Sequence, residues 1–121
     1  MSKSDRGPRF KQKLPPSREI AEEVYRVGEI NNVEPSKVIL FGSYATGDHT
    51  KDSDVDVVVV SSNIEEDDFY ARSYYWDWDW DYDTYPELDL IVLRPEEFED
   101  YKNRENHIVS TAVDTGEIFK F

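Results

Sequence analysis

Short apolar runs at four places along the chain predict the strands of a sheet. Turn-forming residues bound these runs, a pattern that is typical of buried strands. The runs are Val38–Phe41, the stretch that opens with Asp54 and ends at Val60, Pro86–Leu93, and a terminal piece with Ile118, Phe119 and Phe121. In the second run, Val55, Val57 and Val59 share one face of an extended chain, and Val58 and Val60 share the other.

Helices are expected in the segments between these runs. The first should cover Arg18–Asn31, with Ser17 as its N-cap. One stripe of this helix is apolar and predicts its buried face. Further helices are expected over Ser43–Thr46, Ile64–Ser73, a segment that starts at Arg94-Pro95, and a piece near His107–Thr115. The lone His107 is expected at the surface or as a helix cap.

Residues Trp76–Asp83 alternate strictly between an aromatic residue and an aspartate. A period of two predicts an extended arm with an aromatic face and an acidic face. The aromatic face suits contact with a partner, base stacking or self-association through Tyr74–Asp83, and it equally suits covering the edge of the domain's own sheet. Four aspartates would repel a polynucleotide backbone, so nucleic acid is not expected as a partner. A basic protein or a cationic small molecule is favoured.

Length and charge define the expected domain limits. The 121 residues suffice for one domain with a modest core, expected over residues 17–121. The net charge of −13 is uneven, because residues 1–13 hold five basic side chains and one acidic one, which gives +4 there and −17 in the remainder. Residues 1–16, with Pro15 and Pro16 at their end, are therefore predicted to form a mobile basic tail.

The composition also limits the compartment. The chain contains no cysteine, which excludes disulfides and thiol chemistry. No apolar run reaches the length of a signal peptide or a membrane span. We therefore expect a cytoplasmic protein without a membrane partner.

The candidate chemistry begins where the first strand ends. Gly42 and Ser43 follow that strand directly. A short helix opening there would point backbone N–H groups and a hydroxyl outward, which suits an anionic phosphate. Gly42 has no Cβ, so a ligand could approach its backbone closely.

Three carboxylates complete the candidate site. Asp54 and Asp56 are two residues apart, so their side chains project from one face of an extended chain. Two like charges at that spacing repel each other, and a divalent cation such as Mg²⁺ removes the conflict. Asp89 adds a third carboxylate between the leucines of the third run. Three carboxylates beside a phosphate loop suit two-metal nucleotidyl transfer.

Each of these residues also has a plainer interpretation. Gly42-Ser43 fits an ordinary turn from a strand to a helix, and Asp54 fits a turn cap. Asp56 and Asp89 fit exposed strand edges. The occurrence of all of them at these spacings favours the metal site.

These side chains can meet only in one arrangement of the strands. Gly42-Ser43 ends the first strand and Asp54 begins the second, so those strands should be antiparallel. Asp56 and Asp89 both lie near strand beginnings, so the second and third strands should be parallel. The crossover that joins them should contain the helix at Ile64–Ser73. The expected fold class is α/β (α+β), with a small mixed β-sheet and helices packed on it.

The spacing of Gly42-Ser43 and Asp54-Val55-Asp56, with ten residues between them, resembles the signature of the DNA polymerase beta-type nucleotidyltransferase superfamily. Within it, residues 37–45 followed by residues 53–56 are similar to the minimal nucleotidyltransferases of prokaryotes, which are often partnered with HEPN-domain proteins. The resemblance implies the nucleotidyltransferase fold for residues 18–121. Its specific part covers residues 37–60 and Asp89.

The resemblance implies an enzyme that moves AMP from ATP to an acceptor hydroxyl with two Mg²⁺ ions. Asp54 and Asp56 would bind both ions. Asp89 would hold the catalytic ion and help to deprotonate the acceptor. The triphosphate would lie against Gly42 and Ser43.

Two further residues are expected near the nucleotide. Many relatives have an arginine close to the position of Ala45, whereas this chain continues with Thr46-Gly47. Lys51 is the nearest alternative cation for the phosphates. Ser53 is expected to hydrogen-bond the turn that aims Asp54.

The acceptor is expected to be another chain. Larger relatives add a domain that presents the acceptor, and 121 residues leave no room for one. By resemblance, the partner is a HEPN-domain toxin, and this protein is the antitoxin that AMPylates it. Two alternatives stay open. One is a catalytically inactive antitoxin subunit that binds nucleotide or protein, and the other is a nucleotidyltransferase of the aminoglycoside-modifying kind, whose cationic substrates suit the acidic surface.

Overall fold

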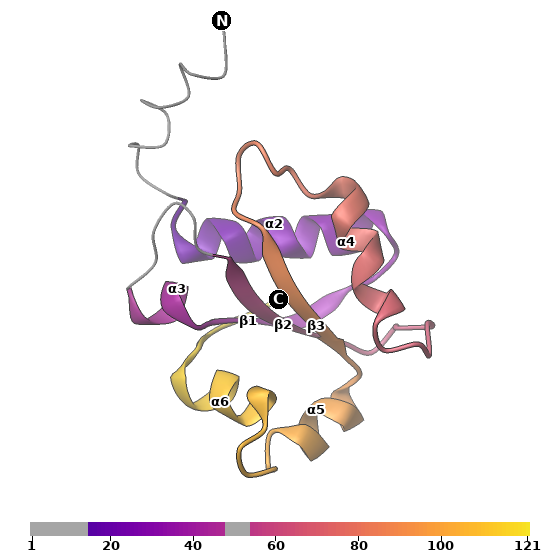
Figure 1. Ribbon diagram of the computed structural model, residues 1–121. Coiled ribbons are helices and arrows are strands. Elements are labelled where there is room, and N and C mark those ends of the chain that lie inside the picture. The colour runs from indigo at the N-terminus through magenta and orange to yellow at the C-terminus, as the bar shows by residue number, and fades with distance from the viewer. Residues whose placement is uncertain (1–14, 48–53) are drawn as a thin grey trace, which may run out of the picture.

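The computed structural model describes residues 15–47 and 54–121, which form a four-stranded sheet with helices on both faces (Figure 1). The elements in chain order are α2 (Ser17–Ile30), β1 (Pro35–Phe41), α3 (Ser43–Thr46), β2 (Val55–Ser61), the 3₁₀ helix η2 (Ala71–Ser73), α4 (Tyr74–Asp79), β3 (Leu88–Leu93), α5 (Pro95–Tyr101), α6 (Ile108–Thr115) and β4 (Glu117–Lys120).

The sheet has the predicted mixed topology. Its strands lie in the order β3-β2-β1-β4. β1 is antiparallel to both β2 and β4, whereas β2 and β3 are parallel. The terminal strand β4 lies at the sheet edge, as expected. The predicted fold class, α/β (α+β) with a small mixed sheet and packed helices, is confirmed.

Two hydrophobic cores cover the two faces of the sheet. α2 and α4 pack on one face, and α5 and α6 pack on the other (Figure 1). The alternation of valines in β2 follows this division as predicted. Val55, Val57 and Val59 belong to the core under α2 and α4, and Val58 and Val60 belong to the core under α5 and α6.

The crossover between β2 and β3 differs from the prediction in two ways. The predicted helix over Ile64–Ser73 does not form. Residues 64–70 are irregular, and only Ala71–Ser73 form a 3₁₀ turn. In a helix the carboxylates of Glu65 and Asp68, three residues apart, would face each other and repel. The carboxylate of Asp68 instead accepts the backbone N–H groups of Tyr70 and Ala71.

The predicted extended arm over Trp76–Asp83 is also wrong. Residues Tyr74–Asp79 form the helix α4. Aromatic residues at every second position also contain pairs four residues apart, and these pairs share one side of a helix. Trp76 and Trp80 form such a pair and are both buried. Burial of these two indoles therefore outweighs the strand period.

The remaining boundaries shift only slightly. Pro16, not Ser17, is the N-cap of α2, and Ser17 is the first helical residue. His107 is the N-cap of α6, since its Nδ1 accepts the backbone N–H of Val109 at 3.1 Å. The predicted tail, residues 1–16, lies almost wholly outside the described residues. Among the helices that the structure describes, none is long and apolar enough to cross a membrane.

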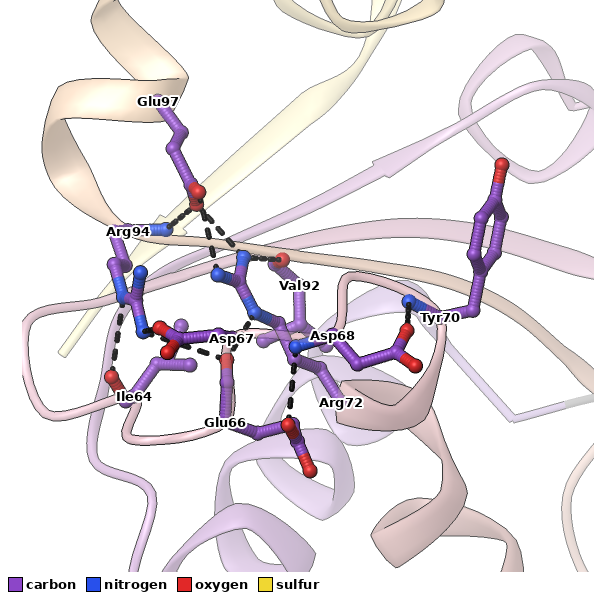
Figure 2. A network of polar contacts seen from close by, with 9 residues as sticks. All are labelled: Ile64, Glu66, Asp67, Asp68, Tyr70, Arg72, Val92, Arg94 and Glu97. Carbon is purple, nitrogen blue, oxygen red and sulfur yellow. Dashed lines mark hydrogen bonds and ion pairs between the residues drawn. The ribbon is translucent and has the colours of Figure 1, made fainter.

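A buried arginine fixes the irregular segment after β2 (Figure 2). Arg72, only 3% exposed, donates from Nε to the Glu66 carbonyl at 2.8 Å and from Nη1 to the Val92 carbonyl at 3.1 Å. Its guanidinium also forms a two-pronged ion pair with Glu97, at 2.7 and 3.2 Å. Glu97 in turn accepts the backbone N–H of Arg94 at 2.7 Å. The network joins the loop after β2, the end of β3 and the first turn of α5.

The charge of Glu97 is held in place by this network. Burial alone would raise the pKa of Glu97, but the hydrogen bonds from Arg72 and from the backbone of Arg94 outweigh burial and lower it below its ordinary value. An acid with a lowered pKa in the folded state adds stability above its unfolded pKa. This stability is lost as the pH falls through the folded pKa.

Replacing Glu97 with glutamine should lower the free energy of unfolding by about 2–3 kcal/mol, because the guanidinium of Arg72 would stay buried without a counter-charge. Urea unfolding at neutral pH measures the loss. The matched control is Asp67→Asn, since Asp67 pairs with Arg94 at 2.8 Å but has an exposed carboxylate, and solvent screens such pairs. An equal loss in both variants would contradict the role of burial.

Candidate active site

The predicted site residues that the structure describes gather where β1 ends and β2 and β3 begin, and we refer to this end of the strands as the active-site edge of the sheet. In the antiparallel register Phe41 lies opposite Asp56, and in the parallel register Asp56 lies beside Asp89. All three therefore belong to the face that carries α5 and α6 farther along the strands. The sheet thus brings Asp56 and Asp89 next to the end of β1.

Gly42 lies directly against Asp56. Its φ of +72° falls in the region that favours glycine. A Cβ built on Gly42 would collide with Oδ2 of Asp56. Glycine is therefore required here twice, once for the backbone angle and once for space. The sequence pointed to close approach of a ligand at this position, but it did not identify Asp56 as the neighbour, because that contact follows from the register that places Phe41 opposite Asp56.

The helix α3 continues the turn as predicted. The backbone N–H groups of Ala45 and Thr46 both donate to the Gly42 carbonyl, at 3.1 and 3.2 Å. Ser43, the first residue of α3, is partly exposed at the site edge. Gly47 ends the helix in the left-handed region, with φ +82°.

Repulsion between carboxylates marks the centre of the site. The pKa of Asp56 is raised from its ordinary value by burial first, then by the charges of Asp89 and Asp54 and by a hydrogen bond with Asp89. Asp56 is partly buried, whereas Asp54 and Asp89 are exposed. The structure thus brings Asp56 and Asp89 into contact and places Asp54 near enough to act on Asp56 through its charge.

The carboxylate pair fits a divalent cation, since the repulsion that raises the pKa of Asp56 would be relieved by positive charge. Asp56 and Asp89 could supply oxygen ligands from two strands, with Asp54 beside them. Within residues 15–47 and 54–121, no group of three or more histidine, aspartate or glutamate side chains is arranged to hold a metal ion. Asp56 and Asp89 thus offer two carboxylate ligands for a cation.

Two predicted nucleotide-binding residues lie outside the described residues. Lys51 and Ser53 fall between the two described ranges, so their proposed contacts stay predictions.

Tyr44 is buried in the core under α2, and burial raises the pKa of its hydroxyl.

Replacing Gly42 with alanine should lower stability and displace the Asp56 carboxylate, whereas Gly47→Ala should only lower stability. Both glycines have positive φ, so each variant should lose about 1–2 kcal/mol of unfolding free energy from backbone strain. At Gly42 the new methyl group would meet the carboxylate of Asp56. Around Gly47 no heavy atom of the described residues, its chain neighbours and its own helix backbone left aside, lies within 4 Å of the added Cβ. Chemical unfolding with and without Mg²⁺ measures both effects. Equal unfolding losses and equal Mg²⁺ responses in the two variants would contradict the contact.

The metal-free protein should lose stability as the pH rises through the raised pKa of Asp56. An acid with a raised pKa in the folded state contributes stability that is fully present below its unfolded pKa, near 3.8, and is lost as the pH passes the folded value. Asp56→Asn removes this titration and should be more stable than the wild type above that window. Unfolding curves from pH 3 to 8 in a chelator test this, and identical pH profiles would contradict it.

Comparison with known proteins identifies the family of the chain. A family profile described as "Nucleotidyltransferase domain" matches residues 17–115. A protein of Methanocaldococcus jannaschii named "Putative protein adenylyltransferase" is 62% identical over 24 residues, which are 20% of this chain and 24% of that protein. The match thus spans about a quarter of that relative.

A solved structure described as a "putative nucleotidyltransferase from Sulfolobus solfataricus" is 26% identical, with a TM-score of 0.49, and the match covers 74% of this chain and 82% of that one. The family profile covers most of the chain, including β1, β2 and β3 and all three aspartates. The protein therefore belongs to the nucleotidyltransferase domain family.

Proposed function

We propose that this protein transfers AMP from ATP to a hydroxyl group of a partner protein. The observation that carries the proposal is the contact of Asp56 and Asp89 beside Gly42, at the edge where β1 ends and β2 begins. This places carboxylates for a cation directly against a glycine turn that suits a phosphate chain. The family of the chain supports the reaction class.

Magnesium would be held by Asp56 and Asp89, with Asp54 as an exposed third ligand. When bound, the two ions of the proposal supply positive charge to the phosphates and lower the pKa of the attacking hydroxyl. The raised pKa of Asp56 in the metal-free protein supports a cation here, because Asp56 and Asp89 repel each other without one.

The chain's own residues would orient the two reactants. Gly42 and Ser43 would bind the triphosphate through their backbone, and Lys51 and Ser53, which follow α3 in the sequence, would add contacts. Asp89, exposed at the start of β3, would accept the proton of the acceptor hydroxyl. The acceptor oxygen would bond to the α-phosphorus as the bond to pyrophosphate breaks.

A protein is the favoured acceptor, and a HEPN-domain toxin is the proposed one. The short match to a relative whose name is that of a protein adenylyltransferase supports a protein acceptor. The resemblance of residues 37–60 to the minimal nucleotidyltransferases supports the HEPN partner. Under this proposal the protein is an antitoxin that acts by AMPylation.

Asp56→Asn and Asp89→Asn should each lower AMP transfer by about 1,000-fold, since several kcal/mol of charge stabilisation would be lost with a metal ligand. The measurement is the transfer of label from α-labelled ATP with Mg²⁺ to a purified HEPN-domain protein. Glu117→Gln is the matched control, because Glu117 is an exposed carboxylate at the same sheet edge, opposite Leu40, outside the pair.

The outcomes separate the proposal from its alternatives. Label on the partner that disappears in both aspartate variants supports it. Label on an aminoglycoside instead would favour a small-molecule nucleotidyltransferase. Toxin neutralisation that survives Asp56→Asn without any label transfer would favour an inactive binding subunit and contradict the proposed reaction.

A further inference from the structure

The helix α4 presents two different aromatic faces. The inner face carries Trp76 and Trp80, which are 1% and 4% exposed. Their indole N–H groups donate to backbone carbonyls, that of Trp76 to Val24 at 3.0 Å and that of Trp80 to Pro86 at 2.8 Å. These two residues therefore anchor α4 to α2 and to the loop before β3.

The outer face carries large aromatic side chains that the fold does not bury. Trp78 is 86% exposed, Tyr74 is 60% exposed, and Tyr70, just before η2, is 77% exposed. Figure 2 shows the Tyr70 ring directed away from the Arg72 network. With Tyr82, 47% exposed, these residues recur every four positions, and we refer to all four as the aromatic stripe. Summed over the four side chains, of which Tyr74 and Trp78 lie on α4 itself, the exposed aromatic surface is roughly 400–700 Å².

Acidic side chains flank this stripe. At 100° per residue, Asp77 and Asp79 fall on either side of the direction of Tyr74 and Trp78. Asp77 accepts a hydrogen bond from the Tyr82 hydroxyl at 2.8 Å, and Asp79 accepts one from Asn31 at 3.1 Å. Residues 65–87 hold nine carboxylates and one arginine, a net charge of −8. That arginine is buried against Glu97, so it does not offset the acidic surface.

We propose that the aromatic stripe is the docking surface for a basic protein, with the aromatic rings as its centre and the carboxylates as its rim. Charge decides among the occupants. A polynucleotide would be repelled by the net charge of −8, and so would a second copy of this chain, which would bring the same carboxylates together. Lysine and arginine side chains would complement the rim and stack on the exposed rings. Aromatic residues in the centre of a patch are also the usual anchors of protein interfaces.

The inference rests on the proposed function in one respect, because it identifies the docked protein with the acceptor of AMP. The loop after α4 joins the stripe to the active-site edge. The indole N–H of Trp80 donates to the Pro86 carbonyl within this loop, and the Glu87 carbonyl accepts the backbone N–H of Val55 at 2.8 Å. Residues 80–87 thus connect α4 to the start of β3. Because α4 packs on the opposite face of the sheet from Asp56 and Asp89, the docked protein would reach Asp89 around the ends of the strands.

A defined polymer tests the surface without knowledge of the partner. The probe is a labelled lysine–tyrosine copolymer, which combines positive charge, rings and acceptor hydroxyls; a glutamate–tyrosine copolymer is the charge-reversed control. We expect the wild-type protein to bind only the basic copolymer. Trp78→Ala and Tyr74→Ala should each weaken this binding at least about tenfold. Ile108→Ala on α6, an apolar position that is 50% exposed, should leave it unchanged.

Further arms separate the possible outcomes. Asp56→Asn should bind the copolymer like the wild type while it loses AMP transfer, as the proposed function expects. A wild-type protein that binds the copolymer but transfers no AMP overturns the reaction and leaves the docking surface standing. Equal binding by Trp78→Ala and the wild type overturns the docking surface, provided that thermal unfolding shows both to be folded. Self-association or oligonucleotide binding that disappears in Trp78→Ala, without an effect on copolymer binding, also overturns it and identifies the other occupant.

Discussion

The central constraint on this structure is that the sheet holds two like charges, Asp56 and Asp89, side by side at the start of two apolar strands. Asp56 and Asp89 are partners in the parallel register of β2 and β3, and their repulsion opposes that register. The strand interior fixes it, because Val57, Val58 and Val59 are fully buried. A slip of one residue would turn every side chain of β2 to the opposite face. The two hydrophobic cores therefore supply the free energy that keeps the carboxylates together.

The same constraint reaches the first strand. Gly42 combines a positive φ with contact against Asp56, so the turn after β1 is shaped by the carboxylate that it faces. A close contact between backbone and carboxylate and a pair of like charges occur at one point, where the surrounding strands are apolar. Such a conflict between local preference and overall fold is typical of functional sites. A bound cation and a phosphate chain would relieve it, which is why we place the chemistry here and not at the buried ion pair of Arg72 and Glu97, where every charge is already matched.

The strands and the centre of the site could be predicted because their signals are local and mutually consistent. The valine run of β2 is explained by burial on both faces, and the positions of Gly42 and Asp56 then fix which strands are antiparallel. The fine geometry could not be predicted in the same way. The contact of Gly42 with Asp56 depends on the pairing of Phe41 with Asp56, and a sequence does not state its register. The roles of Lys51 and Ser53 stay predictions, since both lie outside the described residues.

The crossover was mispredicted because two periods are present in the same residues. Rings at positions 76, 78, 80 and 82 alternate with aspartates as in a strand, yet 76 pairs with 80, and 74 with 78, at helical spacing. The core takes the first pair, since each indole N–H reaches a backbone carbonyl there, and this choice makes the segment helical. It also forces the second pair outward, with an aspartate on either side. Folding therefore accounts for half of these rings and offers no reason for the other half to be aromatic, so the exposed half calls for a partner.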